Sequence, residues 1–145
     1  MPTTPAAPVQ TWSTQHSPGA YLTDAWEDAL GSSYGGGLAD RAVDQRFNAS
    51  IRRREFAGLR VVECECDPCG GQRLAPLIRR DTAPFIGVQI TRSGSERFHF
   101  GDEALPVGAG DLVIWTSEQP TRFTVMERLH KVSLVLPWAD LQELL

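Results

Sequence analysis

Hydrophobic and polar residues alternate along the second half of the chain, in short runs separated by turn residues. From Phe85 to Thr91, for example, Ile86, Val88 and Ile90 fall on one face of an extended chain and Gln89 falls on the other. Alternation with period two is typical of a β-strand that packs on at least one side. Similar patterns predict further strands at 47–56, 59–65, 96–100, 112–115, 121–126 and 129–136. Short strands with a turn signal every eight to twelve residues, such as Ser93–Ser95, indicate a sandwich or barrel.

Two segments carry the three- and four-residue spacing of an amphipathic helix. The first is Leu22–Tyr34, whose apolar stripe should pack against the outside of the barrel; its members are Leu22, Trp26, Ala29, Leu30 and Ser33. Trp26 is therefore expected in the core and not in a ligand site. The second helix should begin at Pro137, since proline suits the first helical turn. Its apolar face comprises Trp138, Leu141, Leu144 and Leu145.

Composition and charge narrow the class of protein. With 145 residues, 41% hydrophobic and 22% charged, the chain is expected to form one globular domain. The net charge of −4 argues against nucleic-acid binding by this chain alone, because that requires an excess of Lys and Arg. No signal peptide and no apolar stretch of membrane-spanning length is present, so we expect a cytoplasmic protein without a membrane partner.

The first 21 residues are rich in Pro, Thr and Ala and are expected to form a flexible arm. Trp12 is the exception within it, because an indole in a loose arm is a candidate anchor. It would either cover a groove near the first helix or fold over a ligand pocket.

All three cysteines lie within six residues, at Cys64, Cys66 and Cys69. Thiolates at this spacing could hold a soft metal or form a redox switch. A structural zinc site needs a fourth ligand, which His99, His130 or a partner chain would have to supply. The other interpretation is that Cys64 and Cys66 are simply small buried residues of a strand.

The stretch PVGAGDLVIWTSEQPTRF, from Pro106 to Phe123, resembles the second half of the cupin pattern. A wider set of features resembles one branch of that superfamily, the AraC-binding-like sensing domain of AraC-type transcription regulators. These features are spread over residues 22–142 and comprise Ala25–Leu30, Arg52–Leu59, Ile78–Asp81, Val88–Ile90 with Ser93–Gly94, Gly110–Val113 and Leu134–Leu141.

The resemblance implies a mainly β fold, a cupin-like jelly-roll barrel with an N-terminal and a C-terminal helix. The sensing domain would span 22–136, and residues 137–145 would begin a dimerisation or linker helix. DNA would be bound only by a C-terminal domain that this chain does not contain.

Enzymatic cupins hold a metal with an H-x-H pair, a Glu and a further His. Here that last position, after Pro120, is Thr121, and the place for the pair, 78–82, contains no His. His99 and His130 lie on separate predicted strands. We therefore expect no enzyme, cofactor or metal, and a metal-dependent cupin enzyme is the least favoured alternative.

A barrel interior without catalytic groups suits a small organic effector, such as an aromatic compound or a carboxylate. If Thr121 points inward, Phe123 shares its face, and Trp115 and Gln89 on other strands are further candidates. The predicted ligand-binding residues are thus Gln89, Trp115, Thr121, Phe123 and Trp12. The predicted function is effector sensing and homodimerisation through the helix that starts at Pro137.

Overall fold

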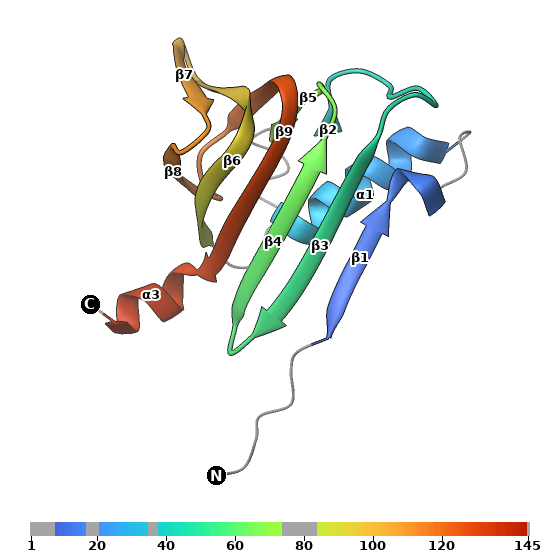
Figure 1. Ribbon diagram of the computed structural model, residues 1–145. Helices are drawn as coiled ribbons and strands as arrows, with labels where there is room; N and C mark the ends of the chain where they lie inside the picture. Colours follow the sequence, from blue (N-terminus) through green and yellow to red (C-terminus); the bar gives the residue numbers. More distant parts are fainter. Residues whose placement is uncertain (1–7, 17–20, 35–37, 74–83, 145) are drawn as a thin grey trace.

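The computed structural model (Figure 1) describes residues 8–16, 21–34, 38–73 and 84–144. Within them, nine strands form one curled sheet and a helix lies near each end. The strands are β1 (Val9–Ser13), β2 (Leu38–Ala39), β3 (Ala49–Phe56), β4 (Leu59–Cys66), β5 (Gly70–Arg73), β6 (Phe85–Phe100), β7 (Glu103–Gly108), β8 (Leu112–Thr116) and β9 (Thr121–Pro137). The helices are α1 (Leu22–Tyr34), α3 (Trp138–Leu144) and the short 3-10 helix η1 (Thr14–His16). A mainly β fold with two helices confirms the sequence prediction.

Strand β9 is the centre of the sheet. Its first part, from Thr121 to Thr124, pairs with β5, and its second part, from Leu129 to Val135, pairs with β4. Along its other edge it pairs with β6 over almost its whole length. β6 in turn carries β7 and β8, while β3 and β1 continue the sheet beyond β4. The sheet thereby curls into a half-barrel with a concave interior (Figure 1).

The predicted turn at Ser93–Ser95 is wrong, because β6 runs through it as one long strand. The strand is bulged there, and its register against β9 shifts between Thr91 and Glu96. Gly94 makes the bulge possible: its φ is +83°, and a Cβ atom there would lie 2.0 Å from the backbone oxygen of Arg128. Bulges of this kind bend a strand without ending it. The predicted strands 85–91 and 96–100 are therefore one bulged strand, β6, and the predicted strands 121–126 and 129–136 are likewise one strand, β9.

Residues 9–13, expected to belong to a flexible arm, form β1. This strand pairs antiparallel with β3, with Trp12 opposite Ile51. The Trp12 ring lies 5.6 Å from the ring of Trp26 on α1. Of the two roles considered for Trp12, this position matches the cover near the first helix.

Helix α1 lies on the concave side of the sheet, behind β1, β3 and β4 in Figure 1. Its bounds and its buried stripe are those predicted. The prediction that the stripe packs on the outside of the barrel is wrong, since Trp26 and Leu30 line the interior cavity. The stripe packs against the inward residues of β3 and β4 in the main core, including Ile51, Val62 and Cys64. The helix therefore closes the open side of the half-barrel.

Helix α3 follows β9 directly and buries none of its side chains. The backbone N–H of Trp138 donates to the carbonyl of Pro84 at 3.0 Å, which ties the start of the helix to the beginning of β6. Within the described residues, no helix has the length and apolar character needed to cross a membrane.

Candidate ligand-binding cavity

Strands β6 and β9 each turn two polar residues of their paired stretch inward. In β6, Gln89 and Thr91 are each only 1% exposed, whereas Ile90 between them is 48% exposed. In β9, Lys131 faces the interior and Ser133 is fully buried, whereas Leu134 is 38% exposed. Buried polar groups carry a desolvation penalty that a simple core would avoid. This inverted pattern therefore indicates an interior built to contact something other than the protein itself.

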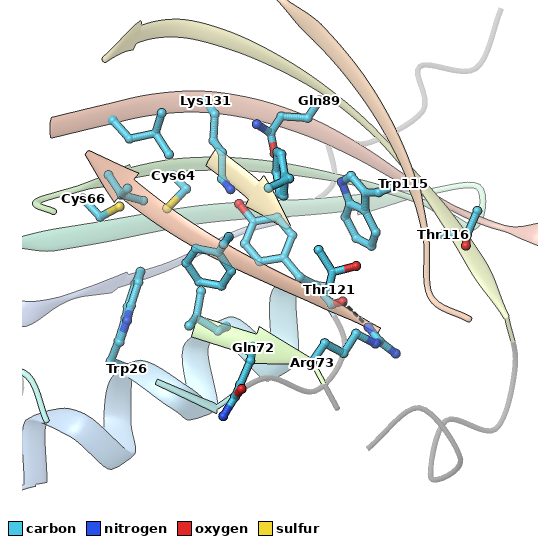
Figure 2. Close-up of a pocket in the computed structure, with 16 residues that line it drawn as sticks. Trp26, Cys64, Cys66, Gln72, Arg73, Gln89, Trp115, Thr116, Thr121 and Lys131 are labelled. Atoms are coloured by element: carbon cyan, nitrogen blue, oxygen red, sulfur yellow. Dashed lines mark hydrogen bonds between the residues drawn. The ribbon is translucent and has the colours of Figure 1, made fainter. Parts of the chain in front are cut away.

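The interior contains a cavity of about 100 Å³ between the sheet and α1. Figure 2 shows Lys131 and Gln89 at one end of it and Gln72 and Arg73 at the opposite end. The wall is mostly apolar and aromatic, and its residues are Trp26, Leu30, Tyr34, Cys64, Cys66, Gln72, Arg73, Gln89, Phe98, Trp115, Thr116, Thr121, Phe123, Val125, Leu129 and Lys131. An apolar cavity with a few convergent polar groups is the usual form of a small-molecule site.

Lys131 places a buried cation in this wall. Its side chain is 12% exposed, and its Nζ lies 3.6 Å from Oε1 of Glu96. The ammonium also lies over two aromatic faces, 5.2 Å from the ring centre of Tyr34 and 5.8 Å from that of Phe123. Burial acts to lower the pKa of Lys131, but Glu96 and the neighbouring cysteines together act against it, and the pKa is raised. Lys131 is thus charged at neutral pH.

Glu96 is held behind Lys131 in a buried polar network. Its side chain is fully buried, and its Oε1 accepts a hydrogen bond from Nε2 of Gln89. Its other oxygen, Oε2, has no hydrogen-bond partner among the described residues. Gln89 is near enough to Thr91 for a further, long hydrogen bond of 3.5 Å. The network fixes the carboxylate, and the carboxylate fixes the position of the ammonium.

Tyr34, at the end of α1, brings a hydroxyl to the same region. The hydroxyl is buried beside the Cys64 thiol. Burial, together with the neighbouring Cys64, raises the pKa of Tyr34 well above its ordinary value. The phenol is therefore protonated and retains a hydrogen to donate.

Two glycines make room for the aromatic walls. A Cβ atom on Gly87 of β6 would lie 2.2 Å from the indole of Trp115, and one on Gly71 of β5 would lie 2.5 Å from the ring of Phe123. These distances are shorter than any non-bonded contact between carbon atoms. Glycine at these two positions lets both rings lie flat against the neighbouring strands, and the space between the rings stays open.

Arg73 provides a second cation at the opposite end. Its Nη1 donates to the backbone carbonyl of Tyr34 at 3.1 Å, and its guanidinium lies over the Phe85 ring, 5.1 Å from the centre. Burial lowers the pKa of Arg73, but guanidinium remains protonated in proteins. The hydrogen bond also joins the end of α1 to β5.

Cys64 and Cys66 lie in the wall, whereas Cys69 is half-buried in the turn before β5. A hydrogen bond with Cys66, together with burial, raises the pKa of the Cys64 thiol well above its ordinary value. A buried, protonated thiol is a poor nucleophile and a poor metal ligand. Among the described residues, no group of three or more His, Cys, Asp or Glu side chains is arranged to hold a metal ion.

Four of the five predicted site residues, Gln89, Trp115, Thr121 and Phe123, line the cavity. Trp12 does not; it lines a separate groove between β1 and α1. His99 and His130, considered for a metal site, also lie outside the cavity, and His130 is near Glu63 and Glu65 on the sheet's outer surface. The position expected for an H-x-H pair, 78–82, is outside the described residues.

Sequence reasoning missed Lys131, Arg73 and Tyr34. A signal for Lys131 existed, because Leu129, Lys131, Ser133 and Val135 alternate on one face of β9. If the more apolar face of β9 is taken as the inner one, Val132 and Leu134 are assigned to the interior and Lys131 is assigned to the outside. Tyr34 could have been found by extending the helical stripe one turn beyond Leu30.

Comparison with known proteins places the chain in a family. The sequence profile of the AraC-binding-like domain matches residues 26–145. The chain belongs to the AraC-binding-like domain family. This confirms the resemblance drawn from the scattered sequence features. No curated protein matches the sequence.

Solved structures show the same fold. The AraC-like transcriptional activator CuxR superposes with a TM-score of 0.78 at 14% identity, over 94% of this chain and 49% of that one. This AraC-binding-like chain thus spans about half the length of the activator. The ethanolamine utilization protein EutQ is similar over a smaller part: the Salmonella typhimurium protein gives a TM-score of 0.51 at 9% identity, over 62% of this chain and 70% of that one. These neighbours share the curled, mainly β fold of this chain.

Proposed function

We propose that this chain is the effector-sensing and dimerisation domain of an AraC-type transcription regulator, with DNA bound by a separate part of such a regulator. The family and the fold support the sensing role. The observation that carries it is the cavity, whose aromatic walls surround a buried cation. None of the described residues that line it is His, Asp or Glu, and the wall offers a largely aromatic binding surface.

The sensing role is tested by native mass spectrometry of the freshly purified chain. A retained small organic compound that is released on denaturation supports it, and the mass identifies the compound. To show that the compound occupies the cavity, the same measurement is made on Gly87→Leu, whose side chain would push Trp115 into the cavity. Equal retention by the variant would place the compound elsewhere and would count against the proposal.

Dimerisation is supported by the outer face of the sheet. Residues that point away from the cavity on β8, β6 and β9 align in register: Leu112 with Ile90, and Ile114 with Val88, which in turn faces Leu134. Ile114 is 60% exposed and Leu112 is 57% exposed. We name this set, Val88, Ile90, Leu112, Ile114 and Leu134, the outer apolar face. Exposed contiguous apolar patches typically mark interaction sites.

Helix α3 extends this surface, because it continues from β9 and exposes Trp138 and Leu144. We propose that a second copy of the chain covers α3 and the outer apolar face together. The margins favour a copy of the same chain: exposed acidic residues, Asp111 and Glu118, flank β8, while Arg54 lies at the other side, on β3. A two-fold axis along the strands would bring opposite margins together.

Sedimentation velocity tests this arrangement. Ile114→Lys should shift the chain from dimer to monomer, because a charge would be buried in the contact. Leu105→Lys is the matched control, since Leu105 is a similarly exposed residue, 43%, on β7 outside the outer apolar face. A wild-type chain that remains monomeric at high concentration would overturn the proposal. A dimer that survives Ile114→Lys but is lost on deletion from Pro137 would restrict the contact to α3.

A further inference from the structure

We propose that Cys66 and Cys69 form a redox-active dithiol, which a hydroperoxide oxidises to a disulfide. Cys69 is the thiol that the oxidant reaches, and Cys66 is the thiol that closes the bridge. This assigns a modification site to the segment Cys-Asp-Pro-Cys at 66–69. The site is independent of the effector proposed above, because its chemistry needs no ligand in the cavity.

The three thiols form a chain of contacts that leads from the interior to the surface. Cys64 donates a hydrogen bond to Cys66, and Cys66 donates one to Cys69. Cys64 and Cys66 line the cavity (Figure 2), whereas Cys69 is half-buried and lines a separate groove of about 750 Å³. Partly exposed cysteines are the ones that oxidants reach. A small oxidant therefore meets Cys69 first, and the next sulfur inward is already in contact with it.

Hydrogen bonding and burial keep Cys66 protonated until it reacts. The hydrogen bond that it accepts from Cys64 lowers the pKa of the Cys66 thiol, but its own donation to Cys69 and its burial raise the pKa, which ends well above the ordinary value. A protonated thiol is a poor nucleophile toward a hydroperoxide. Cys66 is therefore suited to the second step of the oxidation and not to the first.

The oxidation takes place in two steps. Cys69 gives up its proton and attacks one oxygen of the hydroperoxide; the O–O bond breaks, Cys69 becomes a sulfenic acid, and the departing oxygen takes the proton. The Cys66 sulfur then attacks the Cys69 sulfur, the S–OH bond breaks, and the Cys66 hydrogen leaves with the hydroxyl as water. The two thiols lose two electrons, and the hydroperoxide gains them.

The turn between the two cysteines holds the backbone in place. The Asp67 N–H donates to the carbonyl of Asn48 at 3.0 Å, and the Asn48 N–H donates to Asp67 Oδ2 at 2.9 Å. On the other side, the Val125 N–H donates to the carbonyl of Cys69 at 2.7 Å. Pro68 fixes a further backbone angle. Because the backbone is held on both sides of the pair, the bridge closes by rotation of side chains that are already in contact.

Cys64 and Cys66 are less suited to a bridge with each other. They lie two residues apart on one face of β4, so their Cβ atoms are about 6.6 Å apart. A disulfide needs a Cβ separation of about 3.5–4.5 Å. The strand resists shortening there, because Cys64 and Cys66 are paired with β3 along one edge and with β9 along the other.

The dithiol connects the groove with the cavity. A bond to Cys69 draws the Cys66 sulfur away from Cys64 and removes the hydrogen that Cys66 donates. Leu129, which is paired with Cys66 in the sheet, also lines the cavity. An oxidant at the groove thereby alters the wall of the cavity without entering it.

The test starts from the reduced, purified chain, treated with a small excess of hydrogen peroxide. Free thiols are counted after denaturation, and the intact mass is measured. We expect the count to fall from the three free thiols to one, with a loss of two hydrogens, no added oxygen and full reversal by dithiothreitol. Three remaining thiols, a stable oxygen adduct in place of the bridge, or a bridge between two chains would each overturn the proposal.

The position of the bridge is read from the unaltered chain. Trypsin releases residues 61–73 as one peptide that contains all three cysteines, and mild acid then cleaves its Asp67–Pro68 bond. A bridge from Cys66 to Cys69 keeps the two fragments together until dithiothreitol is added. Fragments that separate without a reductant would place the bridge between Cys64 and Cys66, contrary to the proposal.

Three variants assign the roles. Cys69→Ala should oxidise at least ten-fold more slowly and form no bridge, and Cys66→Ala should stop at a sulfenic acid on Cys69, which dimedone traps. Cys64→Ala is the matched control, a buried thiol of the same strand, and should still form the bridge. A bridge that persists in Cys69→Ala, or is lost in Cys64→Ala, would refute the assignment. The acid-cleavage result on the unaltered chain remains decisive if a variant does not fold.

Discussion

Replacing Lys131 by Met should destabilise the domain strongly, because it leaves Glu96 buried without its cation. At 3.6 Å and an effective dielectric constant of about 20, the attraction between the two charges is about 5 kcal/mol. Removing one partner of a buried pair typically costs about 3–5 kcal/mol. We therefore expect Lys131→Met to lower the free energy of unfolding by about 3–4 kcal/mol at pH 7.

Glu96→Gln should cost less, about 1–2 kcal/mol, because the ammonium of Lys131 faces the cavity and can bind water there. The double variant should be no less stable than Lys131→Met alone. The coupling between the two positions should therefore at least equal the cost of Glu96→Gln, about 1–2 kcal/mol. Urea denaturation followed by far-UV circular dichroism measures all four proteins. If the two single effects add to within about 0.5 kcal/mol, the ion pair does not stabilise the fold and the reasoning is refuted.

Three further predictions concern the sheet and its thiols. Gly94→Ala should destabilise the domain by more than about 2 kcal/mol. Gly101→Ala, also at positive φ but with open space around it, should cost only about 1 kcal/mol. Urea denaturation compares the two variants, and equal effects would contradict the steric argument. The pKa of the Cys64 thiol is raised in the folded state above its ordinary 9.0, so the unfolded chain loses that proton first and the stability should fall as the pH rises above about 9. Cys64→Ala should reduce this dependence of the melting temperature on pH. An unchanged dependence would contradict a buried thiol. Trp12→Ala should lower the melting temperature and leave retention of the co-purified compound unchanged, because Trp12 packs on Trp26 and does not line the cavity. Loss of the compound in native mass spectrometry would bring Trp12 into the site.

Most strands could be predicted from the sequence, because the alternation of polar and apolar residues along β3, β4 and β8 is typical of an extended chain. It was insufficient at Ser93–Ser95, where a local turn signal competes with a partner strand. Only the pairing of β6 with β9 decides that competition, and pairing is a long-range property. β1 was missed for the same reason, since its composition is that of a loose segment and its order comes from β3.

The site was partly predictable, because inward positions alternate with outward ones. Gln89, Trp115, Thr121 and Phe123 were assigned to the interior through the resemblance to cupins. The rule that apolar residues face inward fails at Lys131, because this lysine lines the cavity while Leu134, on the other face of the strand, is exposed. A sequence pattern divides the residues of a strand between two faces, but what packs against each face decides which of them is the inner one.

The central position of β9 has a consequence for how the chain folds during synthesis. Among the described residues, the hydrogen-bonded path of the sheet from the β3–β4 hairpin to the β6–β8 unit runs through this strand, which ends at Pro137. The ribosome must therefore release the chain as far as β9 before the two parts of the sheet can join. Until then, the β3–β4 hairpin and β6 both have open edges, which are prone to pair with other chains. A nascent chain stalled before residue 121 should thus be held by chaperones, whereas one extended beyond Pro137 should close in a single step.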